Sequence, residues 1–490
     1  MGNNGHKLKK RGVKLSIYFL SLLIVAIAAI GGTYAWIGRS VTLPSTVEII
    51  QGTNSSTLDI AASERIGAVY QTLLNNYVEG VDKEALIEGA LSGMVEAVGD
   101  PYSQYLNTEE SENLDESISA SFEGIGAEIM SLNQQIVIVS PIKGSPAEKA
   151  GLLPNDIILS ADGESLQGLT ASEAVALIRG EKGSEVVLEI VRGDQTFKVN
   201  ITRDTIPIET VTFELDEEYP EIGIVHVSSF STPTYDDIVS AVTDLRTQGA
   251  TSFVFDFRQN PGGLLDQALK ISNMFLDDGD VIMQTKEKDA EPNKIVASDS
   301  EFGDFKITEP SVLLVDEGSA SASEIVAGAL QESSEIPLVG TTTFGKGTVQ
   351  TVYPLTESSE LKLTVAKWLT PNGNWIHQKG IAVDYEVALP EYATLTIIDS
   401  TATYEEGTVS EEVKNVEAML NAIGYAVEAD GYYDEATVEQ VASFQAANEL
   451  DATGIVTGDT ALAIVEKLRE VLTENDTQYD KAVEILMGNE

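Results

Sequence analysis

The chain has 490 residues, 43% of them hydrophobic, and it contains no cysteine. Because this length exceeds what one hydrophobic core supports, we expect about three folded domains. The absence of cysteine excludes disulfides, thiolate metal sites and cysteine nucleophiles. The formal net charge of −48 disfavours nucleic acid as a partner, since phosphates are bound through clustered Lys and Arg.

The N-terminus predicts a membrane anchor. A basic tail over residues 1–14 precedes an uncharged run over 15–37, which is long enough to cross a hydrocarbon core of about 30 Å as a helix. A cleaved signal peptide, cut near residues 31–35, is the alternative, but its apolar region usually has only about 7–15 residues. Positive charge clusters on the short N-terminal side of this uncharged run. Residues 1–14 are therefore expected in the cytoplasm and everything after about Arg39 outside. We therefore expect a single-pass protein of the cell membrane.

A polar linker over residues 38–62 leads to a helical region over 63–112. The linker is rich in Ser, Thr, Gly and Asn. Between 63 and 98, apolar residues recur at helical spacing. The stretch ends at Gly99-Asp100-Pro101, a typical helix stop.

Residues 113–204 combine short β segments with one helix. Thr170 and Glu173 have the spacing of a capping box and predict a helix that runs to Ile178. The stretch Gly144-Ser145-Pro146-Ala147, followed by Asn155-Asp156-Ile157-Ile158, resembles the PDZ fold; an ordinary glycine-rich hairpin is the alternative. In that fold, backbone N–H groups of one loop bind a peptide's terminal carboxylate while the peptide adds a strand to the sheet. The resemblance assigns this loop to Gly124, Ile125, Gly126 and Ala127.

Strands and helices alternate from residue 205 to 395, which predicts an α/β core. The protein as a whole is therefore expected to be a multidomain α/β protein. Buried strands are predicted over 222–227, 252–257 and 312–315, and helices over 233–248, 264–276 and 322–332.

A polar linker over 396–407 leads to a small all-α domain over 408–472. The motifs Gly424-Tyr425, Asp430-Gly431-Tyr432-Tyr433 and Asp451-Ala452-Thr453-Gly454 resemble the peptidoglycan-binding domain. A generic helical dimerisation module is the alternative. Residues 473–490 are predicted to form a charged tail.

A candidate nucleophile follows the strand that ends at Val315. A small-residue turn leads into a helix, and the N–H groups at a helix start can hold a developing oxyanion. Ser319, Ser321 and Ser323 alternate in this turn, and chemistry alone does not choose among them. Helix capping is the alternative role for these serines.

The base is predicted to be a lysine rather than a histidine. His6 is cytoplasmic, His226 lies inside an apolar strand, and His377 follows Trp375-Ile376 in a structural setting. Lys346 lies in a glycine-rich turn between two β-like segments. A buried lysine can lose its proton and then deprotonate a serine, because burial lowers its pKa from about 10.4.

The lysine turn also matches part of a phosphate-binding loop. Residues 340–346 fit G-x-x-x-x-G-K, but Gly347 stands where Ser or Thr should hold magnesium. Residues 348–354 alternate like a strand where a helix should follow. Both departures disfavour nucleotide binding.

Three motifs in fixed order resemble those of the carboxy-terminal processing peptidases, over residues 63–395. They are Asp256-Phe257-Arg258-Gln259-Asn260-Pro261-Gly262-Gly263, Ser319-Ala320-Ser321-Ala322-Ser323-Glu324 and Phe344-Gly345-Lys346-Gly347-Thr348-Val349-Gln350. The resemblance implies Ser321 as nucleophile, Lys346 as general base and Gln350 as the residue that orients the lysine. It implies an oxyanion hole of backbone N–H groups from Ala322 and from Gly262 or Gly263, with no metal or organic cofactor.

The expected function is therefore a membrane-anchored extracytoplasmic serine endopeptidase with a Ser-Lys dyad. Its expected partners are proteins or peptides with exposed C-termini, peptidoglycan, and a second protomer that pairs through the helices at 63–98. By analogy with the family, the PDZ domain gates the site, with Arg179 as a candidate for the coupling; a solvated helix end is the alternative for Arg179. Two other functions fit part of the sequence: a catalytically silent PDZ and wall-binding scaffold, and a wall hydrolase, for which no zinc ligand set is visible.

Overall fold

The computed structural model describes residues 60–356 and 358–488, which divide into two compact units at Gly89 and Ala90. Helix α2 (Ile60–Asn76) lies in the first unit, and α3 (Lys83–Glu96) crosses the boundary. Both helices fall where helical spacing predicts them. The predicted anchor over 15–37 lies outside the described residues. Within the ranges that are described, no helix is both long and apolar enough to cross a membrane.

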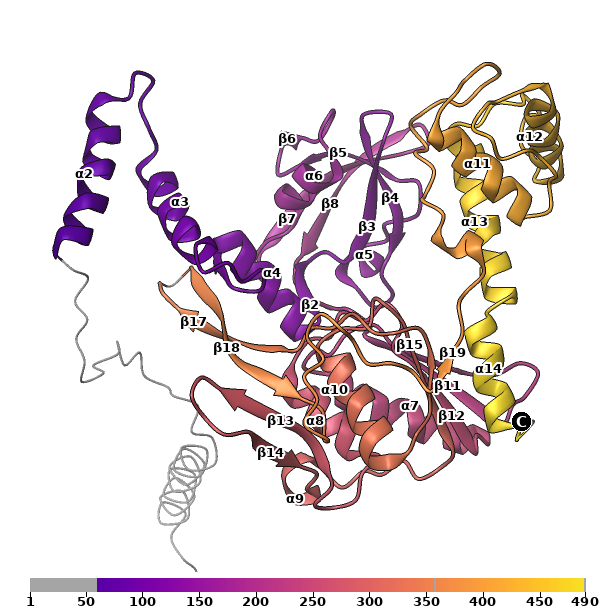
Figure 1. The fold of residues 1–490 in the computed structure, drawn as a ribbon. Coiled ribbons are helices and arrows are strands. Elements are labelled where there is room, and N and C mark those ends of the chain that lie inside the picture. Colours follow the sequence, from indigo (N-terminus) through magenta and orange to yellow (C-terminus); the bar gives the residue numbers. More distant parts are fainter. Residues whose placement is uncertain (1–59, 357, 489–490) are drawn as a thin grey trace, which may run out of the picture. The chain divides into compact units, whose positions relative to one another are not determined.

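A six-stranded sheet lies within the α/β region of the second unit (Figure 1). Every neighbouring pair of strands is parallel except β10 with β11. The central strands are nearly continuous apolar runs because both faces of a parallel sheet are covered. In sheet order the strands are β10 (Val211–Leu215), β11 (Ile222–Val227), β12 (Ser252–Asp256), β15 (Ser311–Val315), β16 (Leu338–Gly340) and β19 (Tyr385–Glu386).

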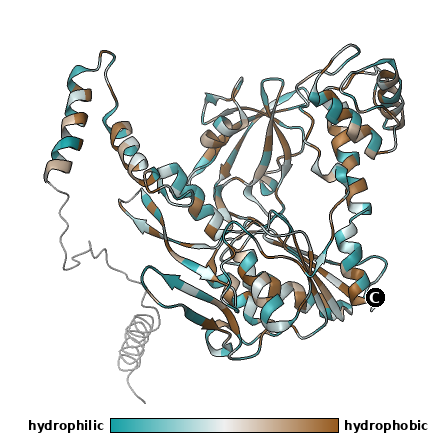
Figure 2. Ribbon diagram, in the orientation of Figure 1, coloured by the Kyte–Doolittle hydropathy of each residue, from teal (hydrophilic) through white to brown (hydrophobic). Residues whose placement is uncertain are grey.

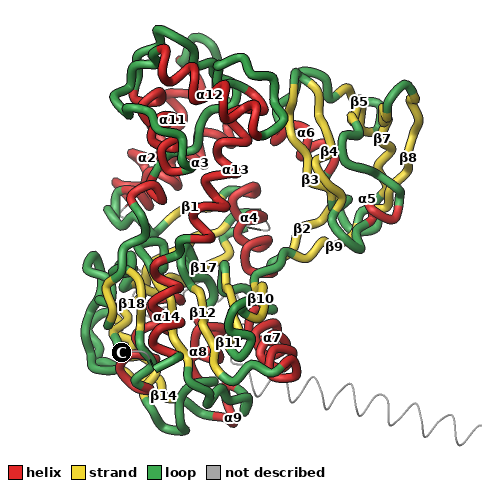
Figure 3. The backbone as a smooth tube through the Cα atoms, turned by 90° about the vertical axis from the view of Figure 1, so that its right-hand side faces the viewer, coloured by secondary structure: helices red, strands yellow, loops and turns green. Residues whose placement is uncertain are grey.

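Side chains of β12 alternate between the two faces of this sheet. Phe253 and Phe255 belong to the largest core, together with residues of α7, α8 and α10. Val254 belongs to a smaller cluster on the other face, with Ala482 of α14. Figure 3 shows α14 beside the strands of this sheet. The four helices are α7 (Thr234–Gln248), α8 (Leu265–Asn273), α10 (Ala322–Ala329) and α14 (Thr477–Leu486).

Helix α14 differs from the charged tail predicted over 473–490. Tyr479, Ala482, Val483 and Leu486 pack into the cluster beneath the sheet. Hydrophobic and hydrophilic residues alternate along the helix (Figure 2), as expected where one side is buried. Ten residues with three charges and few strongly apolar side chains made a weak sequence signal, and the helix gains its stability from the sheet that it covers.

A second, antiparallel sheet has the order β1-β18-β13-β14, with β17 beside β18. The pairing of β17 with β18 shifts register between Val349 and Gln350. Such bulges redirect side chains and are frequent beside active sites. The strands are β1 (Gln104–Leu106), β13 (Val281–Glu287), β14 (Asn293–Val296), β17 (Thr348–Pro354) and β18 (Glu360–Leu369), and the short helix α9 (Asp299–Phe302) follows β14.

The predicted PDZ region contains a sheet of order β3-β4-β5-β7-β8 with its own hydrophobic core. The predicted capping box is confirmed, because Thr170 and Glu173 each bond the other's backbone at the start of α6. The region's predicted start at 113 falls inside α4 (Thr108–Ser119), which leads into a two-stranded sheet of β2 (Ser121–Gly124) and β9 (Asp204–Pro207). The other elements are β3 (Ala127–Leu132), β4 (Gln135–Pro141), α5 (Pro146–Lys149), β5 (Ile157–Ala161), β6 (Glu164–Ser165), α6 (Ala171–Ile178), β7 (Glu185–Arg192) and β8 (Gln195–Thr202).

The C-terminal region is helical, as predicted, and has a separate core. Tyr433 is fully buried there, and its hydroxyl donates to the carbonyl of Gly454. The helices are α11 (Glu411–Ala422), α12 (Glu435–Ala447) and α13 (Gly458–Glu474), and a short turn leads from α13 into α14. The polypeptide therefore leaves the α/β core before this domain and returns to it afterwards.

Candidate active site

The predicted nucleophile lies where a buried strand turns into a helix. Strand β15 is buried along its whole length, and the turn 316–321 leads into α10. Ser321 is the N-cap of α10 and has φ 56° and ψ −109°. A non-glycine residue rarely adopts a positive φ, and surrounding contacts must hold it there. Such strained residues cluster at functional sites.

Hydrogen bonds separate the three serines that the sequence left equivalent. The Ser319 hydroxyl donates to the carbonyl of Phe257 at 2.8 Å, and the Ser323 hydroxyl donates to the carbonyl of Asn260 at 2.9 Å. Both residues are fully buried. Ser321 is half-buried and lines a cavity of about 560 Å³. Of the three hydroxyls, only that of Ser321 is therefore available to a substrate.

Glu324 connects the serine turn to the lysine turn. Its carboxylate is fully buried and accepts the N–H groups of Ser321, Gly345 and Lys346 at 2.7–2.8 Å. The Thr343 hydroxyl donates to it at 2.6 Å. Four donors offset the cost of burying this group. Glu324 thereby fixes the backbone of the nucleophile relative to the backbone of the base.

The turn 341–347 that carries Lys346 is held on both sides. The Trp368 indole donates to the carbonyl of Lys346, and the Trp375 indole donates to that of Gly347, both at 2.8 Å. Gly345 has φ +91°, and a Cβ there would lie 2.8 Å from the backbone nitrogen of Gly380. Only glycine fits this close approach. As predicted, the turn leads into strand β17 rather than a helix, which argues against a phosphate-binding loop.

Ser321, Lys346 and Gln350 line the same cavity but are not hydrogen-bonded to one another in the part of the protein that the structure describes. Lys346 Nζ lies 5.1 Å from the centroid of the Tyr102 ring. Gln350 Nε2 donates to the hydroxyls of Thr348 and Thr364, at 3.0 and 3.3 Å. The Lys346 amine therefore lies at the Tyr102 ring and is not bonded to the Ser321 hydroxyl.

The cavity lowers the pKa of Lys346 below its ordinary value. Burial is the main cause, because it disfavours the charged ammonium, and repulsion from Lys362 adds to it. Glu324 and Asp100 act in the opposite direction without reversing the shift. Lys362 itself lines the cavity. A lowered pKa increases the neutral fraction of the amine, which is the form that accepts a proton.

Backbone N–H groups reach the cavity from two elements. Gly262, Gly263 and Ala322 all line it. The Gly262 N–H already donates to Asn260 Oδ1 at 2.9 Å. Within the described ranges, the N–H groups of Gly263 and Ala322 have no acceptor. A Cβ on Gly262 would lie 2.9 Å from Ser321 Cβ, so this loop packs directly against the nucleophile.

Neither described histidine lines the cavity. The Nδ1 atom of His377 accepts the Gly347 N–H at 3.3 Å, and its ring stacks on Trp375. His226 Nδ1 lies 3.7 Å from Asp256 Oδ2. Both histidines have structural surroundings, in agreement with the sequence-based interpretation.

The predicted carboxylate loop lies at the start of the PDZ region's sheet. Gly124 ends β2, Ile125 is buried, and Ala127 begins β3. A Cβ on Gly126 (φ +72°) would lie 2.5 Å from Ser145 Cβ, so the loop packs against the start of α5. Strand β3 is an edge strand that contacts α6. An edge strand beside a helix is the arrangement to which peptides add as a further strand.

Arg179 bridges this domain to the active-site cavity. It caps the C-terminus of α6, and its Nη1 atom lies 2.7 and 2.9 Å from the two carboxylate oxygens of Glu116 on α4. Its guanidinium also lies over the Phe122 ring. Glu116 and its neighbours Ser117 and Ile118 line the cavity. Arg179 is therefore not a solvated helix end.

Sequence reasoning assigned no role to several residues that shape the site. Glu324 stands inside one of the three motifs, but its position beneath both turns becomes visible only in three dimensions. Lys362 gave no signal beyond its place on a strand. Tyr102 belongs to the stretch Asp100-Pro101-Tyr102-Ser103, which also resembles the peptidase family, but it was assigned no role. The helix α4, which supplies part of the cavity wall, was assigned to the boundary between two domains.

Comparisons with known proteins agree with this architecture. Residues 221–387 match the family model for peptidase family S41, 137–192 the PDZ domain, and 409–464 the putative peptidoglycan-binding domain. Residues 25–110 match the N-terminal domain of the activating protease CtpB.

Two relatives align with almost the whole chain. The carboxy-terminal processing protease CtpA of Bacillus subtilis (strain 168) is 43% identical over 478 residues, which cover 97% of this chain and 99% of that protein. A probable CtpA-like serine protease of Staphylococcus aureus (strain MSSA476) is 36% identical, with coverage of 97% and 93%. Among solved structures, the photosystem II D1 C-terminal processing protease is 28% identical and aligns with a TM-score of 0.39 over 66% of this chain and 88% of that one. The protein thus belongs to the carboxy-terminal processing proteases of peptidase family S41 and is a serine-type peptidase.

Proposed function

We propose that this peptidase cleaves peptide bonds with Ser321 as nucleophile and Lys346 as general base. The observation that carries the proposal is the shared cavity, which is lined by the one available hydroxyl of the serine turn and by a lysine whose pKa is lowered by burial. Glu324 holds the backbones of both residues. Movement of the Lys346 amine from the Tyr102 ring to the Ser321 hydroxyl completes the dyad.

The reaction then proceeds through an acyl-enzyme. Ser321 Oγ attacks the substrate carbonyl while its proton passes to Lys346 Nζ, and the oxyanion receives hydrogen bonds from the N–H groups of Ala322 and Gly263. Lys346 returns the proton to the leaving amine as the C–N bond breaks. A water molecule next gives a proton to Lys346 and attacks the ester, and Ser321 regains its proton as the acid product leaves.

Activity assays on the full-length protein test this assignment. Parent, Ser321→Ala and Lys346→Ala are each incubated with an unfolded protein that has an apolar C-terminus. Cleavage by the parent alone supports the dyad, and cleavage by all three would mean that it is misassigned. Failure of the parent to cleave or to react with a serine-directed covalent probe would favour the scaffold function.

We further propose that the PDZ domain recognises substrate C-termini and gates the site through Arg179. A peptide added beside β3 would contact α6, whose C-terminal arginine pairs with the cavity helix α4. Titration with a peptide that ends in apolar residues tests recognition, with stimulation of cleavage as the expected result. Replacement of the peptide's terminal carboxylate by an amide should abolish that stimulation.

The location of the enzyme is also part of the proposal. The basic tail and uncharged run support an anchor with the catalytic and C-terminal domains outside the cytoplasm. The peptidoglycan-binding match supports contact with the wall. Digestion of intact cells by an external protease should remove a C-terminal tag while leaving an N-terminal tag intact. Co-sedimentation with purified wall tests the second contact.

A further inference from the structure

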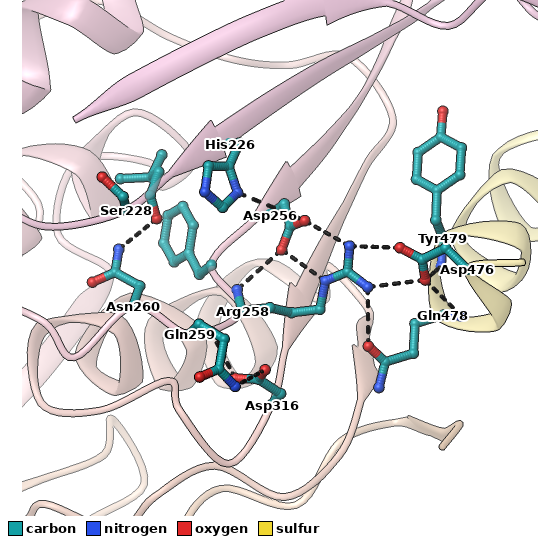
Figure 4. Close-up of polar contacts among 12 residues, drawn as sticks. His226, Ser228, Asp256, Arg258, Gln259, Asn260, Asp316, Asp476, Gln478 and Tyr479 are labelled. Carbon is teal, nitrogen blue, oxygen red and sulfur yellow. Dashed lines mark hydrogen bonds and ion pairs between the residues drawn. The ribbon is translucent and has the colours of Figure 1, made fainter. Parts of the chain in front are cut away.

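Helix α14 lies against the loop that supplies part of the proposed oxyanion hole. This loop, residues 258–263, follows β12 and ends at the glycines beside Ser321. Helix α14 has Asp476 as its N-cap and packs on the same sheet. Figure 4 shows Arg258 at the first position of the loop, between Asp256 and Asp476. Asp476 is 218 residues away from Arg258 in the sequence.

Four hydrogen bonds and one further ion-pair contact hold the Arg258 guanidinium. The Nε and Nη2 atoms donate to the two carboxylate oxygens of Asp256 at 2.9 and 2.7 Å. On the other side, Nη1 and Nη2 lie 2.9 and 2.8 Å from the two oxygens of Asp476. Nη1 also donates to Gln478 Oε1 at 3.1 Å. A planar guanidinium paired with two carboxylates in this way has little freedom to rotate.

Asp476 is itself held in place by the helix that it caps. Its Oδ1 atom accepts the N–H groups of Gln478 and Tyr479 at 3.2 and 3.0 Å. Gln478 Nε2 donates to the carbonyl of Val387, which ties the first turn of the helix to the α/β core. The carboxylate is therefore a fixed partner for Arg258 rather than a mobile one.

The order imposed on Arg258 continues along the loop to the nucleophile. Gln259 has a positive φ of 56°, and its backbone N–H and side-chain amide both donate to Asp316. The carbonyl of Asn260 accepts from the Ala320 N–H and the Ser323 hydroxyl, on either side of Ser321. Pro261 follows, and then the two glycines that line the cavity. A shift at Arg258 would therefore displace the N–H groups that receive the oxyanion.

We propose that Asp476 is a positioning residue for catalysis, which acts through Arg258 to hold the loop 258–263 in its oxyanion-binding conformation. The inference rests on the oxyanion hole of the proposed function. It makes the segment that follows the peptidoglycan-binding domain a working part of the peptidase. The helical domain over 411–474 is thereby joined at both ends to the α/β core.

Three substitutions on α14 in the full-length protein test this role. Asp476→Asn removes the charge that faces Arg258 but keeps a side chain that caps helices equally well. Tyr479→Phe loosens the same helix by removing the hydrogen bond from the Tyr479 hydroxyl to Asp216 but keeps the backbone bond to Asp476. Figure 4 shows the Tyr479 ring pointing away from Arg258. Glu484→Gln removes a charge from an exposed pair with Lys481. The readouts are kcat, KM, thermal midpoint and the affinity of a peptide boronate, whose tetrahedral adduct needs the oxyanion contacts.

The expected result is specific to Asp476→Asn. Its kcat should fall on the order of 10- to 100-fold, as expected when oxyanion donors are misplaced. Boronate affinity should fall by a similar factor while KM stays unchanged, and the other two variants should match the parent in both. An unchanged kcat in Asp476→Asn would overturn the inference, and so would losses of kcat that follow the thermal midpoint in all three variants. Each α14 variant is compared with the parent's own kcat. The test of Asp476 can therefore be interpreted even if Ser321→Ala shows that the dyad is misassigned.

Discussion

The α/β core meets its two accessory regions through arginine–carboxylate pairs that differ in exposure. Arg179 and Glu116, between the PDZ domain and α4, have side chains that are 38% and 30% exposed. Arg258 and Asp476, between the loop 258–263 and α14, are 16% and 20% exposed. The first pair has one carboxylate, whereas Arg258 lies between two.

This difference suits the two contacts to different tasks. An ion pair near solvent contributes about 0–1 kcal/mol, so it can open and re-form when a peptide binds. Removal of one partner from a buried pair costs about 3–5 kcal/mol, because the other charge stays behind without compensation. The PDZ contact therefore fits a gate, and the α14 contact fits a permanent support.

The largest effect is expected from Arg258→Met. This change leaves Asp256 and Asp476 facing each other without a cation, and the free energy of unfolding should fall by about 3–5 kcal/mol. Urea denaturation measures the loss, and Arg179→Met is the matched control, with an expected change of about 0–1 kcal/mol. If both variants lost the same free energy of unfolding, the Arg179 and Arg258 contacts would not differ in strength as proposed.

A smaller effect is expected from acid. Burial alone would raise the pKa of Asp256, but the nearby His226 side chain and the hydrogen bonds and charge of Arg258 lower it from 3.8 to about 2. Because the folded pKa lies below the unfolded one, this carboxylate stabilises the protein above about pH 4, and the contribution is lost as pH falls towards 2. The stability difference between parent and Asp256→Asn should therefore shrink between about pH 4 and pH 3. A difference that stays constant would show that Asp256 is not held ionised by Arg258.

Arg179→Ala should change stability by less than about 1 kcal/mol but alter regulation. Without the bond to Glu116, peptide binding at the PDZ domain can no longer act on α4 through this residue. We expect the ratio of peptide-stimulated to basal cleavage to fall, and Glu116→Gln should have the same effect from the other side. If both variants kept the parent's basal and stimulated rates, Arg179 would have no gating role.

The smallest change is expected in the pH profile of Lys362→Met. Burial chiefly lowers the pKa of Lys346, and Lys362 lowers it further by repulsion. Loss of Lys362 should raise that pKa, so the acidic limb of kcat/KM should move to higher pH. Lys367→Met is a control on the same strand, because Lys367 lies over the Trp375 ring. If the acidic limb did not move, Lys362 would have no effect on the pKa of Lys346.

Local patterns in the sequence were sufficient for most of the secondary structure. The strands at β11 and β15 and the capped helix α6 follow from apolar runs and cap spacing, which depend on residues within one turn or one strand. The motif resemblance pointed to Ser321 and Lys346, and the structure places both on one cavity. The spacing could not show that Lys346 lies over Tyr102 rather than on Ser321, because that position depends on the packing of three separate segments.

What the sequence determined by itself was the family, the domain order and the residues proposed to carry the chemistry, because long motifs and periodicity are local properties. Only the tertiary structure decided which serine hydroxyl is available, since Ser319 and Ser323 use theirs on carbonyls more than 60 residues away. It alone placed Glu324 beneath both turns and α14 beneath the sheet. These features depend on burial and on ion pairs between residues that are far apart in the sequence. A local sequence pattern does not show which distant segment will pack against a given residue.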